Sequence, residues 1–273
     1  MRTSKVLQKM RSGRCARFCA LGHYLPFYIR YAAHHGFDGI WLDLEHRAMD
    51  QREVQSILSM CHQHDIDCMV RAPTQERTKL YRYFEDGASG LLMPLVDNAE
   101  EARQIAQAVK FPPIGNRGID GAGLDADYAL DVDNFTDDAN DETFVIVQIE
   151  THNALQQVDE IAAVEGVDGV FVGPADLSLR LGLIDGAPTL EEAIVQVAAA
   201  AARQGKVWGT AGGDVEIWKK HREMGAQILI GAGDFALTGV LEAASKLGGQ
   251  GLIAAHGSWR KDIIGIVDWR AQE

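Results

Sequence analysis

The chain has 273 residues, of which 47% are hydrophobic, and a formal net charge of −13. This length fits one large domain or two small ones with a sizeable core. The acidic balance argues against nucleic acid and anionic membrane surfaces as partners, because both require clustered Lys and Arg. No apolar run reaches the roughly 20 residues that cross a bilayer, and the basic N-terminus lacks the apolar core of a signal peptide. The four cysteines form no CxxC pair, so we expect a cytoplasmic protein with reduced thiols and no membrane partner.

Short apolar runs alternate with amphipathic stretches of helix length. Eight strand–helix units in strict alternation predict an α/β fold with a parallel sheet, and their number favours a closed (β/α)₈ TIM barrel over an open doubly wound sheet. No GxGxxG motif follows the first strand, which disfavours a dinucleotide-binding fold. The predicted strands cover residues 16–21, 39–44, 67–72, 90–95, 144–150, 169–173, 206–211 and 227–231. The predicted helices cover residues 24–35, 50–64, 75–86, 99–109, 151–164, 190–204, 213–224 and 235–246.

Two segments interrupt this alternation. Residues 111–142 form a long insertion, and insertions of this length are usually lids, interface segments or disordered. Its acid-rich second half lacks the residue order of a calcium loop, so we expect a solvated surface there. Residues 249–273 follow the last predicted helix and contain two Trp residues. We therefore expect one barrel domain over residues 1–248 and a C-terminal tail over 249–273 that packs on the barrel or on a neighbouring subunit.

Two carboxylates follow neighbouring strands of this barrel. Glu150 comes directly after FVIVQI, and Asp176 follows GVFVGPA. Parallel strands end at the same edge of a sheet, and catalytic residues of TIM barrels lie at these carboxyl ends. The two acids are therefore candidate ligands of one divalent cation, although ion pairing or helix capping would explain them equally well. Hard oxygen ligands of this kind suit Mg²⁺ or Mn²⁺.

Further polar side chains are expected at the same mouth of the barrel. An Arg beside the cation would bind a carboxylate or stabilise an enolate oxygen. An acid beside a His would orient the imidazole for proton transfer. Each has a simpler explanation, since a lone His is often a satisfied polar residue and Arg71 would pair with Glu45 or Asp43. The residues in this set are Asp43, Glu45, His46, Arg71 and Gln148.

A lysine Schiff base is the main mechanistic alternative, and the placement of the Lys residues disfavours it. Such a lysine needs a desolvated position inside the pocket. The Lys residues lie in tails, on predicted helices or beside helix ends, except Lys206. Lys206 opens the seventh predicted strand, so it lies at the amino end of the barrel, away from the expected site.

Six segments together resemble the HpcH/HpaI family of class II, metal-dependent pyruvate aldolases, over about residues 36 to 246. They are GFDGIWLDLEH, MVRAPTQ, GASGLLMPLVDNAEEAR, FPPIGNRG, VQIETHNAL and VEGVDGVFVGPADLSLRLG. The resemblance implies a TIM-barrel carbon–carbon lyase. It implies reversible cleavage of a 4-hydroxy-2-oxo acid, of the 2-keto-3-deoxy sugar acid type, to pyruvate and an aldehyde through a metal-stabilised pyruvate enolate.

The resemblance also implies roles for single residues and an assembly. It implies a homo-hexamer built as a trimer of dimers; many members carry an interface Asp where this chain has Phe84-Glu85-Asp86, so whether Glu85 replaces it stays open. Small side chains at Ala20 and Ala211 would leave room for a bulky aldehyde. The implied metal ligands for Mg²⁺ or Mn²⁺, with Co²⁺ as a further candidate, are Glu150 and Asp176; the catalytic residues are His46, Asp43 and Arg71; and the substrate-binding residues are Arg71, Gln148, Gly173 and Ala175.

Two other functions remain alternatives. The first is a citrate-lyase-like, Mg²⁺-dependent lyase that acts on a CoA thioester. It would need basic residues near the mouth for the CoA phosphates, and the candidates are Arg71, Arg117 and Arg180. The second is a barrel without catalysis that serves as a binding or assembly subunit.

Overall fold

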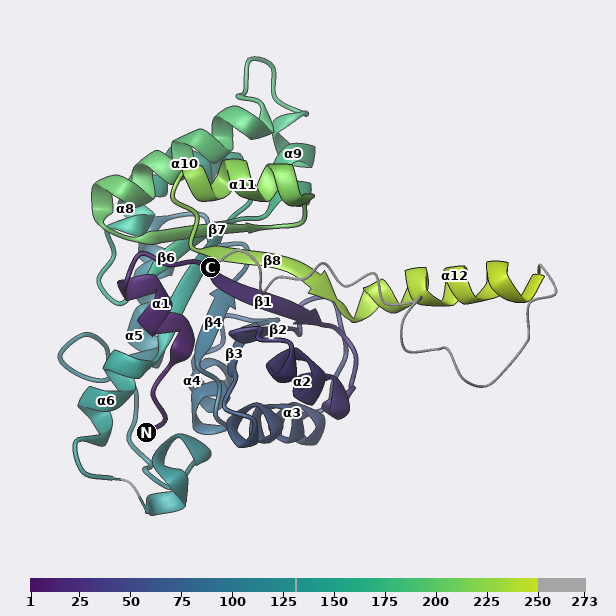
Figure 1. Ribbon diagram of the computed structural model, residues 1–273. Helices are drawn as coiled ribbons and strands as arrows, with labels where there is room; N and C mark the ends of the chain where they lie inside the picture. The colour runs from purple at the N-terminus through teal and green to yellow at the C-terminus, as the bar shows by residue number, and fades with distance from the viewer. Residues whose placement is uncertain (131, 250–273) are drawn as a thin grey trace. The chain divides into compact units, whose positions relative to one another are not determined.

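The computed structural model describes residues 1–130 and 132–249. The chain divides into two compact units, residues 1–232 and residues from 233 onward, and each is described by itself. The first unit holds a closed barrel of eight parallel strands that follow one another in chain order, as Figure 1 shows. The strands are β1 Ala16–Leu21, β2 Gly39–Asp43, β3 Asp67–Arg71, β4 Gly90–Met93, β5 Phe144–Ile149, β6 Gly169–Val172, β7 Val207–Ala211 and β8 Ile228–Gly233.

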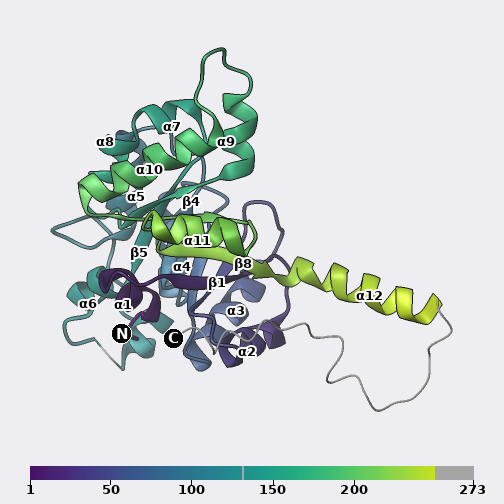
Figure 2. The same cartoon turned by 45° about the horizontal axis from the view of Figure 1, so that its top comes forward.

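Helices lie on the outside of these strands (Figure 2). The predicted (β/α)₈ barrel is therefore confirmed, and every strand begins and ends within two residues of its predicted limits. The predicted helix over residues 151–164 is divided into two short helices. The outer helices are α2 Pro26–His34, α3 Gln51–Gln63, α4 Arg77–Glu85, α5 Ala99–Val109, α7 His152–Gln156, α8 Val158–Ala162, α9 Pro174–Leu181, α10 Leu190–Gln204 and α11 Val215–Glu223.

The strands are covered on both faces, which explains their continuous apolar runs. Every residue of β3, β4, β5 and β6 is buried. Large side chains such as Phe18 and Phe144 fill the barrel interior. Glycines on adjacent strands make room for these rings, since a Cβ on Gly90 would lie 2.1 Å from the Phe144 ring. The interior is thus a packed core up to the mouth.

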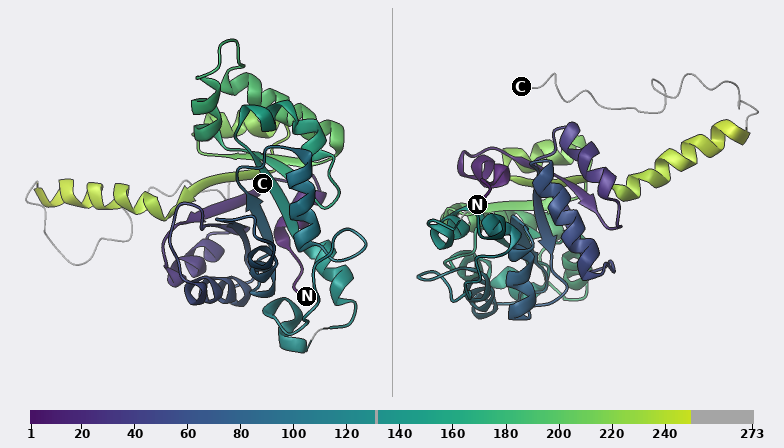
Figure 3. Two further views of the ribbon diagram at one scale, coloured as in Figure 1. Left: turned by 180° about the vertical axis from the view of Figure 1, so that it is seen from behind. Right: turned by 90° about the horizontal axis from the view of Figure 1, so that it is seen from below.

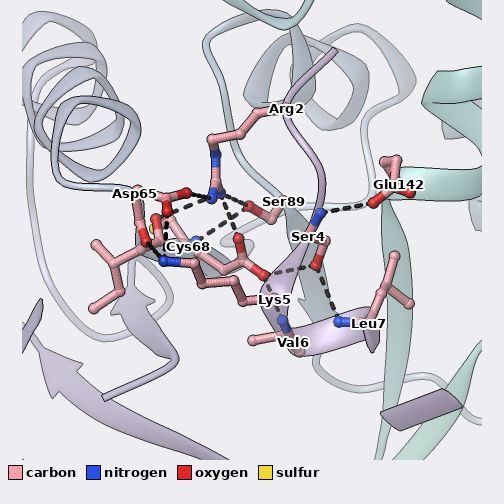
Figure 4. A network of polar contacts seen from close by, with 11 residues as sticks. Arg2, Ser4, Lys5, Val6, Leu7, Asp65, Cys68, Ser89 and Glu142 are labelled. Atoms are coloured by element: carbon pink, nitrogen blue, oxygen red, sulfur yellow. Dashed lines mark hydrogen bonds and ion pairs between the residues drawn. The ribbon is translucent and has the colours of Figure 1, made fainter. Parts of the chain in front are cut away.

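An N-terminal helix, α1 Lys5–Arg11, closes the amino end of the barrel and was not predicted. Val6, Leu7 and Met10 join the interior cluster. Asp67, the first residue of β3, is fully buried and accepts hydrogen bonds from the Ser4 hydroxyl at 2.6 Å and the Val6 N–H at 2.8 Å. The guanidinium of Arg2 also binds Asp67, and it donates to Asp65 and Ser89, as Figure 4 shows. This polar network fastens the helix beneath the strands.

The insertion over residues 111–142 connects α5 to β5, so it lies at the amino end of the barrel. In Figure 3 the N-terminus lies beside this segment, and the Ser4 N–H donates to Glu142 Oε2 at 2.6 Å. The insertion contains a 3₁₀ turn, η1 Leu124–Ala129, and α6 Phe135–Glu142 around a small apolar cluster. The expected solvated surface is found for most of its acids, but Asp125 is buried in an ion pair with Arg117 at 2.6 Å.

The second unit begins with η2 Asp234–Ala236 and continues as α12 Leu237–Gly249, which confirms a helix near the predicted range 235–246. The predicted tail over residues 249–273 lies outside the described residues, apart from Gly249 at the end of α12. Its packing, and the domain boundary at residue 248, stay predictions. Among the helices described, none is long and apolar enough to cross a membrane.

Candidate active site

Glu150 follows the last residue of β5 and is 2% exposed at the carboxyl end of the barrel. Its Oε1 accepts the Leu95 N–H at 2.7 Å, and its Oε2 accepts the Gln148 side-chain amide. Burial raises the pKa of Glu150, and the charges of Glu45 and Asp176 add to this rise against the two hydrogen bonds. A buried carboxylate surrounded by other acids is a position that a bound cation would neutralise.

Leu95 has a left-handed backbone conformation with φ of 52°, which is unusual for a branched side chain. It follows β4 by two residues, and this conformation accompanies the N–H bond to Glu150. Strained backbone of this kind persists where the surrounding structure requires it, often at functional sites. The sequence reasoning did not identify Leu95, because a backbone donor leaves no signature in the side chain.

Asp176 lies in the first turn of α9 rather than in a loop beyond β6. Pro174 is the first residue of this helix, a position at which Pro is favoured. The Asp176 side chain is 46% exposed and forms an ion pair with Arg180 at 3.3 Å, one helical turn later. Arg180 Nη1 also donates to the Glu150 carbonyl oxygen at 2.9 Å. Arg180 therefore joins the two predicted metal ligands, a role that was not predicted for it.

Arg71, at the end of β3, is bound by two carboxylates from the β2 edge. Its Nε donates to Asp43 Oδ1 at 3.0 Å, and Nη2 lies 2.8 Å from Oδ2. Its Nη1 lies 3.1 Å from Glu45 Oε2 as an ion pair without directed hydrogen-bond geometry. Arg71 therefore contacts both Asp43 and Glu45, and at most three of its five N–H groups are engaged. At least two remain for a ligand.

Asp43 has a pKa below its ordinary value. Burial acts to raise the pKa of Asp43, but the hydrogen bond and charge of Arg71 outweigh it, together with the N–H groups of His46 and Glu45. Asp43 thus contacts the backbone of His46, at 3.3 Å, rather than its imidazole. The imidazole is 56% exposed, with Nε2 3.7 Å from Glu45 Oε2. The carboxylate next to the His46 ring is therefore Glu45, which the predicted set of catalytic residues omitted.

Gln148, on β5, and Gly173, which directly follows β6, lie next to each other at the mouth of the barrel. Gln148 is 3% exposed, and among the described residues no donor reaches its Oε1. A Cβ on Gly173 would lie 2.7 Å from Gln148 Nε2 and 2.8 Å from Glu150 Oε2. Because Gly173 has no Cβ, the Gln148 and Glu150 side chains pack directly against its backbone. Ala175, in the first turn of α9, lies between Gly173 and Asp176 in the chain.

These residues fit a divalent cation. Glu150 and Asp176 offer carboxylate oxygens, and Gly173 allows Glu150 to lie close to the start of α9, which carries Asp176. Within the described ranges no three His, Cys, Asp or Glu side chains form a closed metal site. Coordination positions would thus fall to water and to substrate oxygens, as is usual for Mg²⁺ in enzymes.

Lys110, which is buried, lies away from this mouth. Lys110 is 2% exposed, and burial lowers its pKa, which is a property of Schiff-base lysines. However, its amine donates to the Thr143 and Asn140 carbonyl oxygens, just before β5 at the amino end. Lys206 donates to the Val167 carbonyl oxygen, just before β6. Both amines therefore lie at the opposite end of the barrel from Glu150.

Comparisons with known proteins agree with this site. Residues 22–237 match the family model described as HpcH/HpaI aldolase/citrate lyase. The chain is 36% identical over 212 residues to a hydroxypyruvate/pyruvate aldolase from Deinococcus radiodurans, covering 76% of this chain and 75% of that protein. It is 33% identical over 219 residues to a 4-hydroxy-2-oxo-heptane-1,7-dioate aldolase from Escherichia coli, covering 79% and 84%.

A solved structure gives the same result for the fold. The HpcH/HpaI aldolase from Desulfitobacterium hafniense superposes with a TM-score of 0.80 at 32% identity, covering 92% of this chain and 97% of that one. The residues that match the family model, 22–237, include Asp43, Arg71, Glu150 and Gly173. The chain therefore belongs to the HpcH/HpaI aldolase/citrate lyase family of carbon–carbon lyases.

Proposed function

We propose that this protein is a class II pyruvate aldolase that cleaves a 4-hydroxy-2-oxo acid to pyruvate and an aldehyde. The observation that carries the proposal is the placement of buried Glu150, Gln148 and the carboxylate-bound Arg71 at one barrel mouth, where at least two N–H groups of Arg71 are not engaged by the described residues. Relatives at 33% to 36% identity that are named as aldolases of oxo acids support it.

Each residue at the mouth has its own role in the proposed cleavage. Glu150 and Asp176 would hold a divalent cation, Mg²⁺ or Mn²⁺, which would supply Lewis-acid stabilisation of the oxo group. Arg71 binds the oxygen on which negative charge develops when the bond between C3 and C4 breaks. His46 takes the proton of the C4 hydroxyl and returns a proton to C3, which gives pyruvate. Asp43 orients Arg71 and the His46 backbone. Gln148 and the backbone of Gly173 and Ala175 bind the oxo acid.

The test uses the metal directly. Protein treated with a chelator should lose pyruvate-forming activity and regain it with Mg²⁺ or Mn²⁺. Glu150→Gln should remain inactive after metal is added, whereas Glu160→Gln, at an exposed position on α8, should behave like the wild type. Activity that survives chelation and is trapped by borohydride would show a Schiff base instead.

The CoA-thioester alternative finds less support. Of the three arginines that it would use, Arg117 is buried against Asp125 at the amino end. Arg180 is paired with Asp176. Arg71 keeps N–H groups for a ligand at the mouth, but several CoA phosphates would need more than one such arginine. Cleavage of an acyl-CoA thioester in the same assay, with no cleavage of oxo acids, would reverse this preference.

The assembly is part of the proposal as well. Large apolar side chains are exposed on the first unit, among them Phe27 and Tyr31 on α2 and Leu179 on α9. Such surfaces often mark subunit contacts. A homo-hexamer is the expected assembly, and light scattering during size-exclusion chromatography measures it.

A further inference from the structure

Trp41 lies directly beneath the Asp43–Arg71 pair inside the barrel. Trp41 and Asp43 are two residues apart on β2, so their side chains point to the same side of the strand. In the pairing of β2 with β3, Trp41 is opposite Met69 and Asp43 is opposite Arg71. The Trp41 ring packs against the interior cluster, and the Arg71 guanidinium carbon lies 4.7 Å from the ring centroid. The guanidinium therefore lies on the indole face.

The indole of Trp41 places a destabilising buried N–H group at this position. Trp41 Nε1 is buried, and no acceptor for it exists among the described residues. A buried donor without a partner destabilises the fold, and a Phe ring would fill much of the same space without that cost. What Trp offers beyond Phe is the stronger attraction of its π face for a cation. The contact with Arg71 is the interaction in this structure that uses this property.

The three contacts of Arg71 restrict it in different directions. Asp43 and Glu45 bind N–H groups of the guanidinium, and the Trp41 ring contacts its central carbon. Two carboxylates alone would leave the guanidinium free to tilt about these contacts. A cation–π contact from a third direction opposes this tilt. The remaining N–H groups are thereby held in one orientation.

We propose that Trp41 is a positioning residue, whose indole face holds Arg71 in the orientation that binds the oxo acid. This inference rests on the proposed function of Arg71. Ala20 is the register partner of Trp41 on β1, and both side chains pack against the interior cluster.

The experiment compares Trp41→Leu with Trp41→Phe in the synthetic direction, with pyruvate and aldehyde varied separately. Trp41→Leu removes the π face and should raise the KM for pyruvate about tenfold, with a smaller change in the KM for the aldehyde. Trp41→Phe keeps an aromatic face, so its KM for pyruvate should rise much less than that of Trp41→Leu. Equal effects of both variants, or equal changes in both KM values, would overturn the proposal.

Trp208→Leu is the matched control for general damage to the barrel. Trp208, on β7, is 2% exposed and packs among the apolar side chains between the strands and the outer helices. Its Nε1 donates to the Met224 carbonyl oxygen at 3.2 Å. Its loss should lower the melting temperature without changing the KM for pyruvate selectively. A Trp208→Leu variant with the same selective rise in KM would show that the effect of Trp41 is not specific to Arg71.

A double-mutant cycle with Arg71→Lys separates positioning from structure. If Trp41 acts through Arg71, Trp41→Leu should have little further effect on activity in the Arg71→Lys background. Independent, additive effects would contradict the proposal. The fluorescence of Trp41, taken as the difference between the spectra of the wild type and Trp41→Phe, should also change when Arg71 is replaced by Lys. This spectrum needs no substrate, so it decides whether the stack exists even if the wild type forms no pyruvate and the proposed function fails.

Discussion

At the scale of single residues, the mouth of the barrel is a set of carboxylates in which each is restrained differently. Glu150 is buried and held by the Leu95 N–H and by Gln148, whereas Asp176 is half-exposed and tied to Arg180. Asp43 and Glu45 are committed to Arg71. The pair more open to a cation is therefore Glu150 and Asp176. The Glu150 carboxylate has no arginine partner among the described residues, and the Arg180 partner of Asp176 is partly exposed, whereas Asp43 and Glu45 share the buried Arg71.

The raised pKa of Glu150 predicts a stabilising substitution in the metal-free protein. A carboxyl group whose pKa is raised by folding stabilises the native state below its unfolded pKa, and this contribution is lost as pH rises through the folded value. Glu150→Gln should therefore be more stable than the metal-free wild type at neutral pH, and the difference should shrink on acidification. Urea unfolding in chelator at several pH values measures this. A variant that is less stable at every pH would contradict it.

Substitution of Gly173 should reduce the activity while the protein stays folded. In Gly173→Ala the new Cβ would press on Glu150 and Gln148 at under 3 Å, and misplacement of this order can reduce rates by about 10²-fold. The backbone at Gly173 has φ of −86°, which any residue adopts, so the fold should persist by circular dichroism. Gly118→Ala, where a Cβ meets nothing within 4 Å, is the control and should keep wild-type activity.

At the scale of elements, the strands were predicted closely and three helices were missed. Helices α1 and α6 bury only a few residues each, such as Val6 and Phe135, and their remaining positions are polar. Such short patterns are difficult to distinguish from loops. Helix α9 begins directly after β6, so the prediction placed Asp176 in a loop. Pro174 at the helix start, together with Leu177 and Leu181 four residues apart, was the available signal.

Because the buried Asp67 carboxylate anchors α1, removal of its charge should strongly lower the free energy of unfolding. Asp67→Asn would direct an amide N–H₂ at the Ser4, Val6 or Arg2 donors, and the loss of a buried charged partner costs about 3 kcal/mol. Asp65→Asn is the control, because Asp65 is 59% exposed in the same network and exposed pairs contribute about 1 kcal/mol or less. Chemical denaturation measures both free energies. The activity of folded Asp67→Asn should equal that of the wild type, since the network lies at the amino end.

At the scale of the whole molecule, the barrel separates stability from chemistry. The amino end is closed by α1, and the carboxyl end carries the polar groups of the site, most of them buried. The net charge of −13 is a property of the whole surface. It does not prevent a local cationic group such as Arg71 from binding an anionic oxo acid.

A bound cation should stabilise the entire fold. A ligand at 100 times its Kd adds about 2.7 kcal/mol to the free energy of unfolding, which corresponds to roughly 5–10 °C in the melting temperature of a domain of this size. Mn²⁺ added to chelator-treated protein should produce such a shift in a thermal scan. Glu150→Gln should show little shift; an equal shift in both proteins would place the cation elsewhere.

The sequence by itself determined the barrel, the order of its strands and the end at which the polar residues gather. Alternating apolar runs and amphipathic stretches are local patterns, and the carboxyl ends of parallel strands necessarily share one edge. Only the tertiary structure decided which side chains meet there. Glu45 rather than Asp43 lies next to the His46 ring, Arg180 joins Asp176 to Glu150, and the Trp41 face lies under Arg71. These contacts depend on strand register and rotamers across the closed barrel, which residue spacing along the chain does not encode.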